Sequence, residues 1–283
     1  MKVLVTGGAG FVGSNLIKHL KENTDYQITS IDNYFTGDEK NHIEGIKYFI
    51  GNAGDRIQNI EKQDIVFHFA EYSRVVPSFK DIDYLTKTNL YGTARVIEQC
   101  KQWDAKLIYS ASSSKFGGNE NLSPYSWVKA KMVEMIKNYG VWYGLIYEIC
   151  YFYNVYGKNQ IMKGDYATVI GIFERLYKEN KPLTIYGDGM QTRQFTHIND
   201  LVNGISKVID MDYNEEWYLS SEQEHTINEI ADMFMHPKKY IKAKKGERIT
   251  AVIPKNNTKE LLDWKIEYKI RDWIENIIHN EQN

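Results

Sequence analysis

Short apolar runs rich in β-branched residues alternate with longer helical patterns through the first half of the chain. The apolar runs lie at residues 3–6, 27–31, 65–69, 107–110 and 145–149. Stretches with apolar positions at helical spacing lie between them, notably at 11–21, 84–102 and 125–143. Strands that are apolar throughout are typical of sheets buried on both faces, and the intervening helices provide the crossovers of parallel strands. The pattern therefore predicts an α/β fold with a doubly wound parallel sheet.

The rhythm changes after about residue 155, where loops rich in glycine and asparagine separate isolated helices from short strands near 183–186 and 217–219. No low-complexity tract or linker divides the chain at this point. We therefore expect residues 1–155 to form a core domain to which later segments, at about 190–215, return. Residues 156–283 are expected to form mainly a smaller, interwoven C-terminal lobe.

Composition and charge exclude several classes of protein. The chain has 283 residues, a net charge of −2 and two cysteines, Cys100 and Cys150, whose separation does not suit a metal site. The near-neutral charge gives no reason to expect nucleic acid or an anionic membrane as a partner. No apolar run approaches the ~20 residues that span a bilayer, and the apolar start is too short for a signal peptide. We expect a soluble, cytoplasmic protein that needs no metal ion.

The first predicted strand runs directly into the glycine-rich sequence TGGAGFVG at residues 6–13, and a helical pattern follows. This is the G-x-G-x-x-G dinucleotide fingerprint at a strand-to-helix junction. Glycine permits a tight turn and a close approach of the backbone to a pyrophosphate, while the free N–H groups at the start of the helix attract the anion. A glycine-rich turn without a ligand is the alternative. The position of the fingerprint favours a dinucleotide site in a Rossmann-type fold.

Asp32 ends the second predicted strand, 19 residues after Gly13. A carboxylate in this position accepts hydrogen bonds from a ribose diol. Asn33 and Tyr34 follow it, and no arginine or lysine stands beside them to hold a 2′-phosphate. The sequence therefore favours NAD over NADP as the cofactor, the alternative being an aspartate that only caps a helix.

A tyrosine and a lysine four positions apart stand in the sequence SPYSWVKAK. The spacing Tyr-x-x-x-Lys occurs three times, at Tyr125/Lys129, Tyr177/Lys181 and Tyr240/Lys244. The first pair opens a helical pattern shortly after a strand of the core domain, whereas the second runs into a proline and the third lies in a lysine-rich stretch. Residues four apart share a helical face, so the ammonium of Lys129 can stabilise a Tyr125 phenolate. Tyr125 is therefore a candidate catalytic base.

Ordered motifs over nearly the whole chain support a family resemblance. They include TGGAGFVGSNL at the start, VFHFAE at 66–71, NLYGTARVIEQC at 89–100, IYSASSSKFGG at 108–118, YFYNVYG at 151–157 and YGDGMQTRQFTHINDLV at 186–202. With these motifs the chain resembles the extended short-chain dehydrogenase/reductase family, specifically its NAD-dependent nucleotide-sugar epimerases and dehydratases. Among them it resembles UDP-glucose and UDP-N-acetylglucosamine 4-epimerases. The resemblance implies that residues 1–155 bind NAD and that 156–283 mainly bind the substrate.

The resemblance implies a catalytic set of Ser112, Tyr125, Lys129 and Asn89. Tyr125 would act as the base, and Lys129 would also contact the nicotinamide ribose. Ser112 would hydrogen-bond the sugar oxygen, unless the three serines at 112–114 only form a polar loop. Asn89 would steady the lysine through the backbone or a water, unless it is only a helix-turn residue. The residues implied to bind NAD are Gly7, Gly10, Phe11, Val12, Gly13, Asp32, Asn33, Asn52, Ala53, Phe69, Ala70, Asn89, Tyr125, Lys129 and Tyr153.

On the substrate side, the resemblance implies that Asn154 and Arg193 contact the diphosphate, for which a guanidinium offers a planar donor fork. A turn residue and a surface charge are the alternatives. Lys244 stands where many epimerases carry a second arginine, and the small Ala251 is implied to leave room for an N-acetyl group. The residues implied to bind the substrate are Ser112, Tyr125, Asn154, Tyr186, Arg193, Lys244 and Ala251.

Departures from the family pattern bear on the reaction. Dehydratases of the family typically carry a glutamate shortly after the catalytic Ser/Thr, and the related decarboxylases share a nearby glutamate. This chain has Ser113-Ser114-Lys115 in that stretch. Other departures, at Asn52, Tyr151, Gln194 and Pro254, replace residues that are common in the family. Without the glutamate, redox at a single carbinol is what the sequence favours.

We therefore expect an NAD-dependent nucleotide-sugar 4-epimerase that acts on UDP-hexoses or UDP-N-acetylhexosamines through a transient 4-keto sugar. The alternatives are another reductase or dehydratase of the family, a simple NAD-dependent dehydrogenase, and a non-catalytic NAD-sensing protein. The resemblance also implies a homodimer in which helices near 90–102 and 125–143 form a four-helix bundle. Apolar residues at helical spacing there, which could serve the sheet or a partner, are Leu90, Ala94, Ile97, Met132, Met135 and Ile136.

Overall fold

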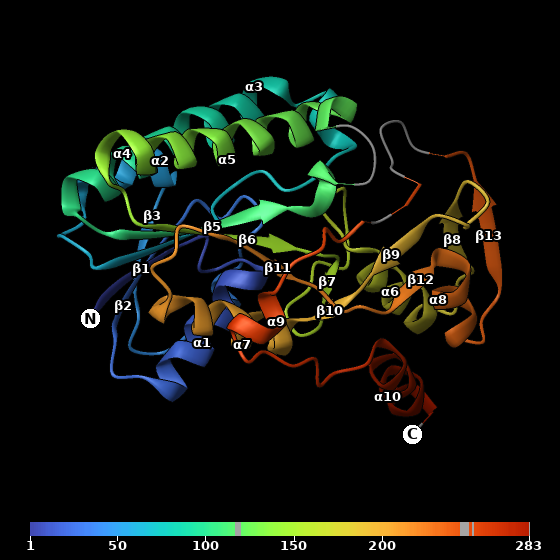
Figure 1. Ribbon diagram of the computed structural model, residues 1–283. Helices are drawn as coiled ribbons and strands as arrows, with labels where there is room; N and C mark the ends of the chain where they lie inside the picture. The colour runs from blue at the N-terminus through green and yellow to red at the C-terminus, as the bar shows by residue number, and fades with distance from the viewer. Residues whose placement is uncertain (117–119, 244–248, 251, 283) are drawn as a thin grey trace.

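A seven-stranded parallel sheet forms the centre of the computed structural model, which describes residues 1–116, 120–243, 249–250 and 252–282 (Figure 1). Its strands are β1 (Lys2–Thr6), β2 (Gln27–Asp32), β3 (Lys47–Ile50), β4 (Ile65–His68), β5 (Lys106–Ser112), β6 (Tyr147–Phe152) and β11 (Glu216–Leu219). Their order is β11-β6-β5-β4-β1-β2-β3. The chain thus starts in the middle, builds one side through β2 and β3, and then crosses to β4 on the other side. The crevice at this switch point, at the carboxyl ends of β1 and β4, is where open α/β sheets bind ligands.

The sheet confirms the predicted doubly wound α/β fold, with two differences at its margins. β3 was not among the predicted strands because it lies at the sheet edge and has no buried residue, so it lacks a continuous apolar pattern. β6 begins two residues later than expected and continues to Phe152, which pairs with Ser112 of β5. The added length carries the chain directly into Asn154 at the carboxyl edge.

Helices cover both faces of the sheet (Figure 1). On one face lie α2 (Ala53–Arg56), α4 (Thr93–Trp103) and α5 (Pro124–Tyr143), and on the other lie α1 (Phe11–Asn23) and α7 (Ile198–Lys207), which pack against each other. The stretch expected as one helix at 84–102 is α3 (Ile82–Leu85), a π-helical segment at Thr86–Gly92 and then α4. Such π segments are rare and frequently occur at functional sites.

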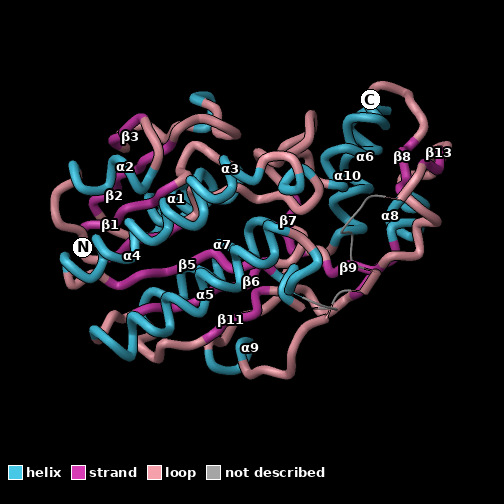
Figure 2. Tube along the Cα trace, turned by 90° about the horizontal axis from the view of Figure 1, so that it is seen from above, coloured by secondary structure: helices cyan, strands magenta, loops and turns pink. Residues whose placement is uncertain are grey.

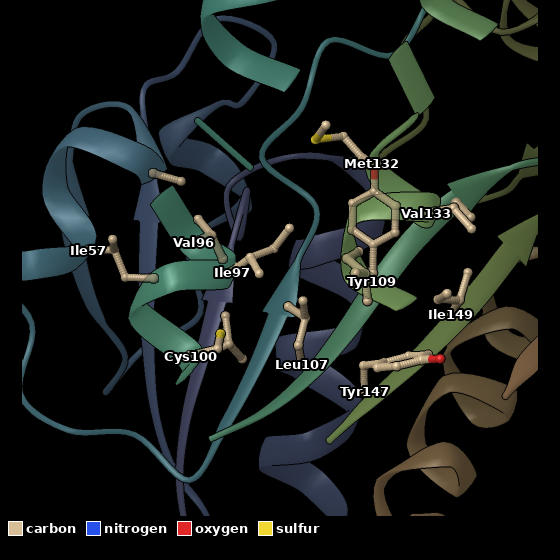
Figure 3. Packing of buried hydrophobic residues seen from close by; sticks show 14 of the residues in the cluster. Ile57, Val96, Ile97, Cys100, Leu107, Tyr109, Met132, Val133, Tyr147 and Ile149 are labelled. Carbon is tan, nitrogen blue, oxygen red and sulfur yellow. The ribbon is translucent and has the colours of Figure 1, made fainter. Parts of the chain in front are cut away.

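The face covered by α4 and α5 holds a large apolar cluster. Figure 3 shows Ile97 of α4 and Met132 and Val133 of α5 near Leu107 and Tyr109 of β5. Of the apolar residues that could have served the sheet or a partner, Ile97, Met132 and Ile136 are buried in this cluster, whereas Leu90, Ala94 and Met135 are half-buried. The buried three therefore serve the sheet, and the other three retain surface for a partner.

The C-terminal lobe packs at the carboxyl edge of the sheet (Figure 2). It consists of α6 (Val169–Lys178), the pairs β8 (Leu183–Tyr186) with β13 (Lys238–Ile241) and β9 (Thr192–Gln194) with β12 (Glu224–Thr226), α8 (Ile227–Met233) and α10 (Ile270–Gln282). A small pair, β7 (Val155–Tyr156) and β10 (Thr196–His197), lies between the two parts, and a short helix, α9 (Thr258–Leu261), packs against β11. The strand expected near 217–219 belongs to the central sheet as β11. Within the described ranges, no helix is both long and apolar enough to cross a membrane.

Candidate active site

A cavity of about 690 Å³ opens between the carboxyl edge of the sheet and the C-terminal lobe. It brings together residues from the loops after β1, β2, β4, β5 and β6 with residues of β8 and β9. The sequence-predicted site residues that line it are Gly7, Gly10, Phe11, Val12, Gly13, Asp32, Asn33, Asn52, Ala53, Phe69, Ala70, Ser112, Tyr125, Lys129, Asn154, Tyr186 and Arg193. Motifs spread over most of the chain therefore meet at one site.

The glycine loop has the shape that a dinucleotide phosphate requires. Gly7 has φ +77°, which glycine adopts readily, and a Cβ on Gly13 would stand 2.2 Å from the carbonyl oxygen of Gly7. α1 then begins with no side chain capping its N–H groups and no acidic residue in its first turn. The loop leaves room for a backbone approach and presents uncapped N–H groups, so its residues fit the pyrophosphate of a dinucleotide.

Asp32 lies at the end of β2 on the same edge of the sheet. Its two carboxylate oxygens accept hydrogen bonds from the backbone N–H groups of Ala9 (2.9 Å) and Tyr34 (2.8 Å). Burial raises the pKa of Asp32, and the backbone donors oppose that rise. Asn33 donates to Asn52 at 2.8 Å, which ties the two predicted cofactor residues together. These residues fit the adenosine ribose of NAD, with the carboxylate oriented before any ligand binds.

Tyr125 and Lys129 lie in the first turns of α5, whose start is well defined by the sequence. The hydroxyl of Ser123 caps the helix by accepting from the N–H of Ser126 (3.1 Å), and Pro124 occupies the first helical position. Tyr125 is 8% exposed and Lys129 is 4% exposed, and both line the cavity. The helix therefore aims both side chains at the carboxyl edge of β5.

The ammonium of Lys129 is held by three groups from neighbouring elements. It donates to the carbonyl oxygen of Ser110 at the end of β5 and to the carboxylate of Glu71, and it lies 4.3 Å from the centre of the Tyr109 ring. Glu71 also accepts from the hydroxyls of Tyr109 (2.9 Å) and Thr93 (3.0 Å). The lysine is therefore a member of a buried polar network.

Glu71 is the functional candidate that sequence reasoning missed. It follows β4 in the motif VFHFAE, and its side chain is 3% exposed beside the cavity. A carboxylate directly after a buried apolar strand, at the edge that binds ligands, was the signal that could have identified it.

Asn89 lies in the π-helical segment and contacts the chain next to Glu71. Its amide donates to the carbonyl of Tyr72 (2.8 Å), and its oxygen accepts from the N–H of Tyr72 (2.7 Å). It does not line the cavity, but this clamp fixes the backbone that carries Glu71. The predicted link from Asn89 to the lysine can therefore run through Tyr72 and Glu71.

Ser112 ends β5 beside the cavity. Its hydroxyl oxygen accepts from the N–H of Ser114 at 3.2 Å, which stabilises the turn. Both Ser113 and Ser114 also line the cavity, so this turn brings three hydroxyl-bearing residues to it.

The side of the cavity that the sequence predicts to bind the substrate is built from less regular segments. Asn154 has φ +31° and donates to the carbonyl of Gln194 at 2.9 Å, while Arg193 is 8% exposed and donates to the carbonyl of Thr192 at 2.7 Å. Tyr153 is fully buried, does not line the cavity, and donates to the carbonyl of Val252 (3.1 Å). Its expected cofactor contact stays a prediction. Lys244 and Ala251 lie outside the described residues.

In the other two tyrosine–lysine pairs, the described residues Tyr177, Lys181 and Tyr240 lie outside the cavity lining. Tyr177 packs its ring against Phe234 and His236, and α6 ends before Lys181, which instead pairs with Glu179 at 2.8 Å. Tyr240 is on β13 and donates to the Asn228 side chain (3.0 Å). Of these three tyrosines, Tyr125 is thus the one that lines the cavity.

Several known proteins are similar to this chain over most of its length. A Methanocaldococcus jannaschii protein, named as an inferred UDP-glucose 4-epimerase, is 32% identical over 99% of this chain and 98% of its own. A UDP-N-acetyl-alpha-D-glucosaminuronate decarboxylase of Bacillus cytotoxicus is 29% identical over 81% of this chain and 78% of its own. The solved UDP-N-acetylglucosamine 4-epimerase of Methanobrevibacter ruminantium, in complex with UDP-N-acetylmuramic acid, superimposes with a TM-score of 0.88 at 25% identity, covering 99% of this chain and 97% of that one.

The family profile settles the assignment at the level of the family. The profile described as the NAD dependent epimerase/dehydratase family matches residues 3–218, which include the glycine loop, Asp32 and the Tyr125/Lys129 pair. NAD is the cofactor of that family, and the glycine cradle and the placed carboxylate of Asp32 fit it. The chain therefore belongs to the NAD-dependent epimerase/dehydratase family.

Proposed function

We propose that the protein is an NAD-dependent nucleotide-sugar 4-epimerase that acts on UDP-hexoses or UDP-N-acetylhexosamines. The observation that carries the proposal is the convergence of Ser112, Tyr125 and Lys129 on one cavity beside a glycine cradle. The epimerase names among the relatives and solved structures support the same reaction.

Tyr125 and Ser112 would perform the proton chemistry. The Tyr125 phenolate takes the proton from the C4 hydroxyl of the sugar and returns it later, and Ser112 hydrogen-bonds the same oxygen as its bonding changes. Lys129 contributes a buried positive charge next to the tyrosine, held in place by the Ser110 carbonyl and Glu71. NAD, when bound, supplies the hydride acceptor and donor.

The carboxylates of the site favour epimerisation over dehydration or decarboxylation. The stretch after Ser112 offers two serines and a lysine where dehydratases place a glutamate. Glu71 does line the cavity, but both of its oxygens are engaged by Lys129, Tyr109 and Thr93. A carboxylate that already accepts from three donors is poorly placed to remove a proton from the sugar ring.

The diphosphate would bind where Asn154 and Arg193 meet the cavity. Arg193 donates to the carbonyl of Thr192 and lines the cavity, so its guanidinium places a buried positive charge in the cavity wall that attracts a diphosphate. We expect the enzyme to work in the cytoplasm as a homodimer. Light scattering at micromolar concentration should give twice the protomer mass, and a monomer would contradict this part of the proposal.

Product analysis on a panel of nucleotide sugars tests the proposed reaction. The purified protein is incubated with UDP-glucose, UDP-N-acetylglucosamine, UDP-glucuronic acid and dTDP-glucose, and the products are identified by NMR. We expect C4 epimers without added NAD, and no product with Tyr125→Phe. A 4-keto-6-deoxy sugar would identify a dehydratase, loss of the C6 carboxylate a decarboxylase, and turnover that consumes added NAD a simple dehydrogenase. Each of these outcomes would overturn the proposal.

A further inference from the structure

We propose that Glu71 is a further positioning residue of this site, which holds Lys129 as its ion-pair partner and offsets the charge of the lysine toward the oxidised nicotinamide. The inference rests on the proposed use of NAD beside Tyr125 and Lys129. It concerns how the polar network around the lysine balances charge.

Glu71 is built into the fold from several sides. Its carboxylate follows β4 and accepts from Thr93 of α4, Tyr109 of β5 and Lys129 of α5. The side chains of the ion pair are 5% exposed for Lys129 and 3% exposed for Glu71. Because solvent does not screen a buried pair, the two charges act on each other and on their surroundings much more strongly than a surface pair would.

Two other titratable groups that face this pair, His68 and Tyr109, are neutral near pH 7. His68 of β4 lies between the hydroxyls of Thr6 (2.8 Å) and Thr93 (2.9 Å), and burial lowers its pKa to about 4. Burial, together with the charge of Glu71, raises the pKa of Tyr109 well above its ordinary value, so it remains a hydrogen-bond donor. Tyr125, which shares α5 with Lys129, is the other ionisable neighbour. Glu71 is the carboxylate that forms an ion pair with the ammonium of Lys129.

Asn89 makes this placement rigid. Its two hydrogen bonds to the backbone of Tyr72 fix the residue next to Glu71, and its position within the π-helical segment is what brings it there. A carboxylate held by its own backbone and by three donors cannot move aside without leaving buried polar groups unsatisfied. The lysine thus has a fixed counter-ion at the cavity wall.

The consequence is a bias between the two states of the cofactor. Oxidised nicotinamide carries a positive charge and reduced nicotinamide does not, so an uncompensated ammonium in the same cavity would disfavour the oxidised form. The negative charge of Glu71 opposes that effect. An epimerase must return its cofactor to the oxidised form in every turnover, so this balance bears directly on the proposed reaction.

The test is the relative affinity for NAD and NADH, measured by calorimetry on the purified protein and its Glu71→Gln variant. Glutamine keeps the size and part of the hydrogen bonding but removes the charge. We expect the Kd ratio of NAD to NADH to rise about tenfold in Glu71→Gln, the scale of one nearby charge in a protein site. Glu148→Gln is the matched control, because Glu148 is fully buried, accepts from Trp217 Nε1 at 2.6 Å and does not line the cavity.

Lys129→Gln distinguishes a positioning role from a direct one. An unpaired buried carboxylate takes up a proton, so Glu71→Gln should change the ratio little in the Lys129→Gln background. An unchanged ratio in the single Glu71→Gln variant, an equal shift in Glu148→Gln, or the same shift in both lysine backgrounds would overturn the proposal. Should Glu71→Gln fail to fold, Glu71→Asp, which withdraws the charge from the lysine, should shift the ratio in the same direction by less, and no shift would overturn it.

The readout is independent of the sugar reaction. If no nucleotide sugar is epimerised and the NAD/NADH ratio still shifts, the proposed function fails and the role of Glu71 stands. If epimers form and the ratio does not shift, the reverse holds.

Discussion

The end of the cavity proposed to bind the cofactor (the cofactor end) and the end proposed to bind the sugar nucleotide (the substrate end) are built in different ways. At the cofactor end, Gly7, Asp32 and Lys129 lie at the ends of long buried strands or in the first turns of a helix. At the substrate end, Arg193 belongs to a strand of three residues and Asn154 to a turn with positive φ. One end is positioned by the sheet and the other by local turns.

This difference determines how strongly a substitution at each end of the cavity is expected to affect the site. The buried network around Glu71 and Lys129 is satisfied from several elements at once, so removing one member leaves others unpaired. Arg193 donates to the carbonyl of Thr192 beside it and Asn154 to the carbonyl of Gln194, so we expect a change there to be absorbed within these short segments. We therefore expect the largest effects at the cofactor end and graded effects at the substrate end.

The largest effect is expected for Tyr125→Phe. Removing the phenol oxygen eliminates the proposed base, and a positioned acid–base group contributes about 10²- to 10⁴-fold to a rate. The variant should lose kcat to that extent and keep its affinity for NAD, as measured by epimer formation and calorimetry.

The matched control for Tyr125→Phe is Tyr177→Phe. Tyr177 has the same spacing to a lysine but packs against Phe234 and lies outside the cavity lining. The control should retain wild-type activity. Activity of Tyr125→Phe within a few-fold of the wild type would remove this residue from the mechanism. It would also contradict the expectation that substitutions at the cofactor end have larger effects than those at the substrate end.

The cofactor end could largely be predicted from the sequence because its signals are local. The glycine fingerprint, Asp32 after the second strand and the Tyr125/Lys129 pair are all defined by short spacings. Glu71 could not be found that way, because its partner Lys129 is 58 positions away and Tyr109 is 38 away. Only the parallel order of β4 and β5 brings them together.

The substrate end was harder to predict for the same physical reason. The residues around Asn154 and Arg193 show no periodic pattern of apolar positions, so the roles of these two residues were assigned from the family resemblance alone. The hydrogen bond between Asn154 and the Gln194 carbonyl, which spans 40 positions, is a product of the tertiary fold. The edge strand β3 and the π-helical segment escaped prediction because exposed edges and single π turns leave no clear pattern of apolar residues.

The next effect in size concerns the choice of dinucleotide. The carboxylate of Asp32 is fixed by the N–H groups of Ala9 and Tyr34, so it cannot easily turn away from a 2′-phosphate. Placing two like charges together costs several kcal/mol, so NAD should bind at least about a hundredfold more tightly than NADP. Calorimetry with each dinucleotide measures this. Equal affinities would mean that the ribose does not meet Asp32.

A smaller effect is expected for Arg193→Lys. Lysine keeps the charge but loses the planar fork, and a charged hydrogen bond contributes about 1.5–3 kcal/mol. KM for the nucleotide sugar should rise about tenfold with kcat nearly unchanged, because the contact is made equally before and during the reaction. Arg271→Lys, on the exposed side of α10, is the control and should change neither. A fall in kcat instead of a rise in KM would place Arg193 closer to the reacting centre.

The smallest effect is expected for substitutions of Asn154, which can separate the role of its backbone conformation from the role of its side-chain amide. Its φ of +31° is unusual for a residue with a side chain, and its amide donates to Gln194. Asn154→Gly keeps the backbone conformation and loses only the amide, so KM should rise about threefold, the value of one neutral hydrogen bond. Asn154→Ala also forces a Cβ into the left-handed region without the amide and should lower the unfolding free energy by about 1 kcal/mol relative to Asn154→Gly. If thermal unfolding and KM are the same in both variants, the strained backbone does not position this residue for the substrate.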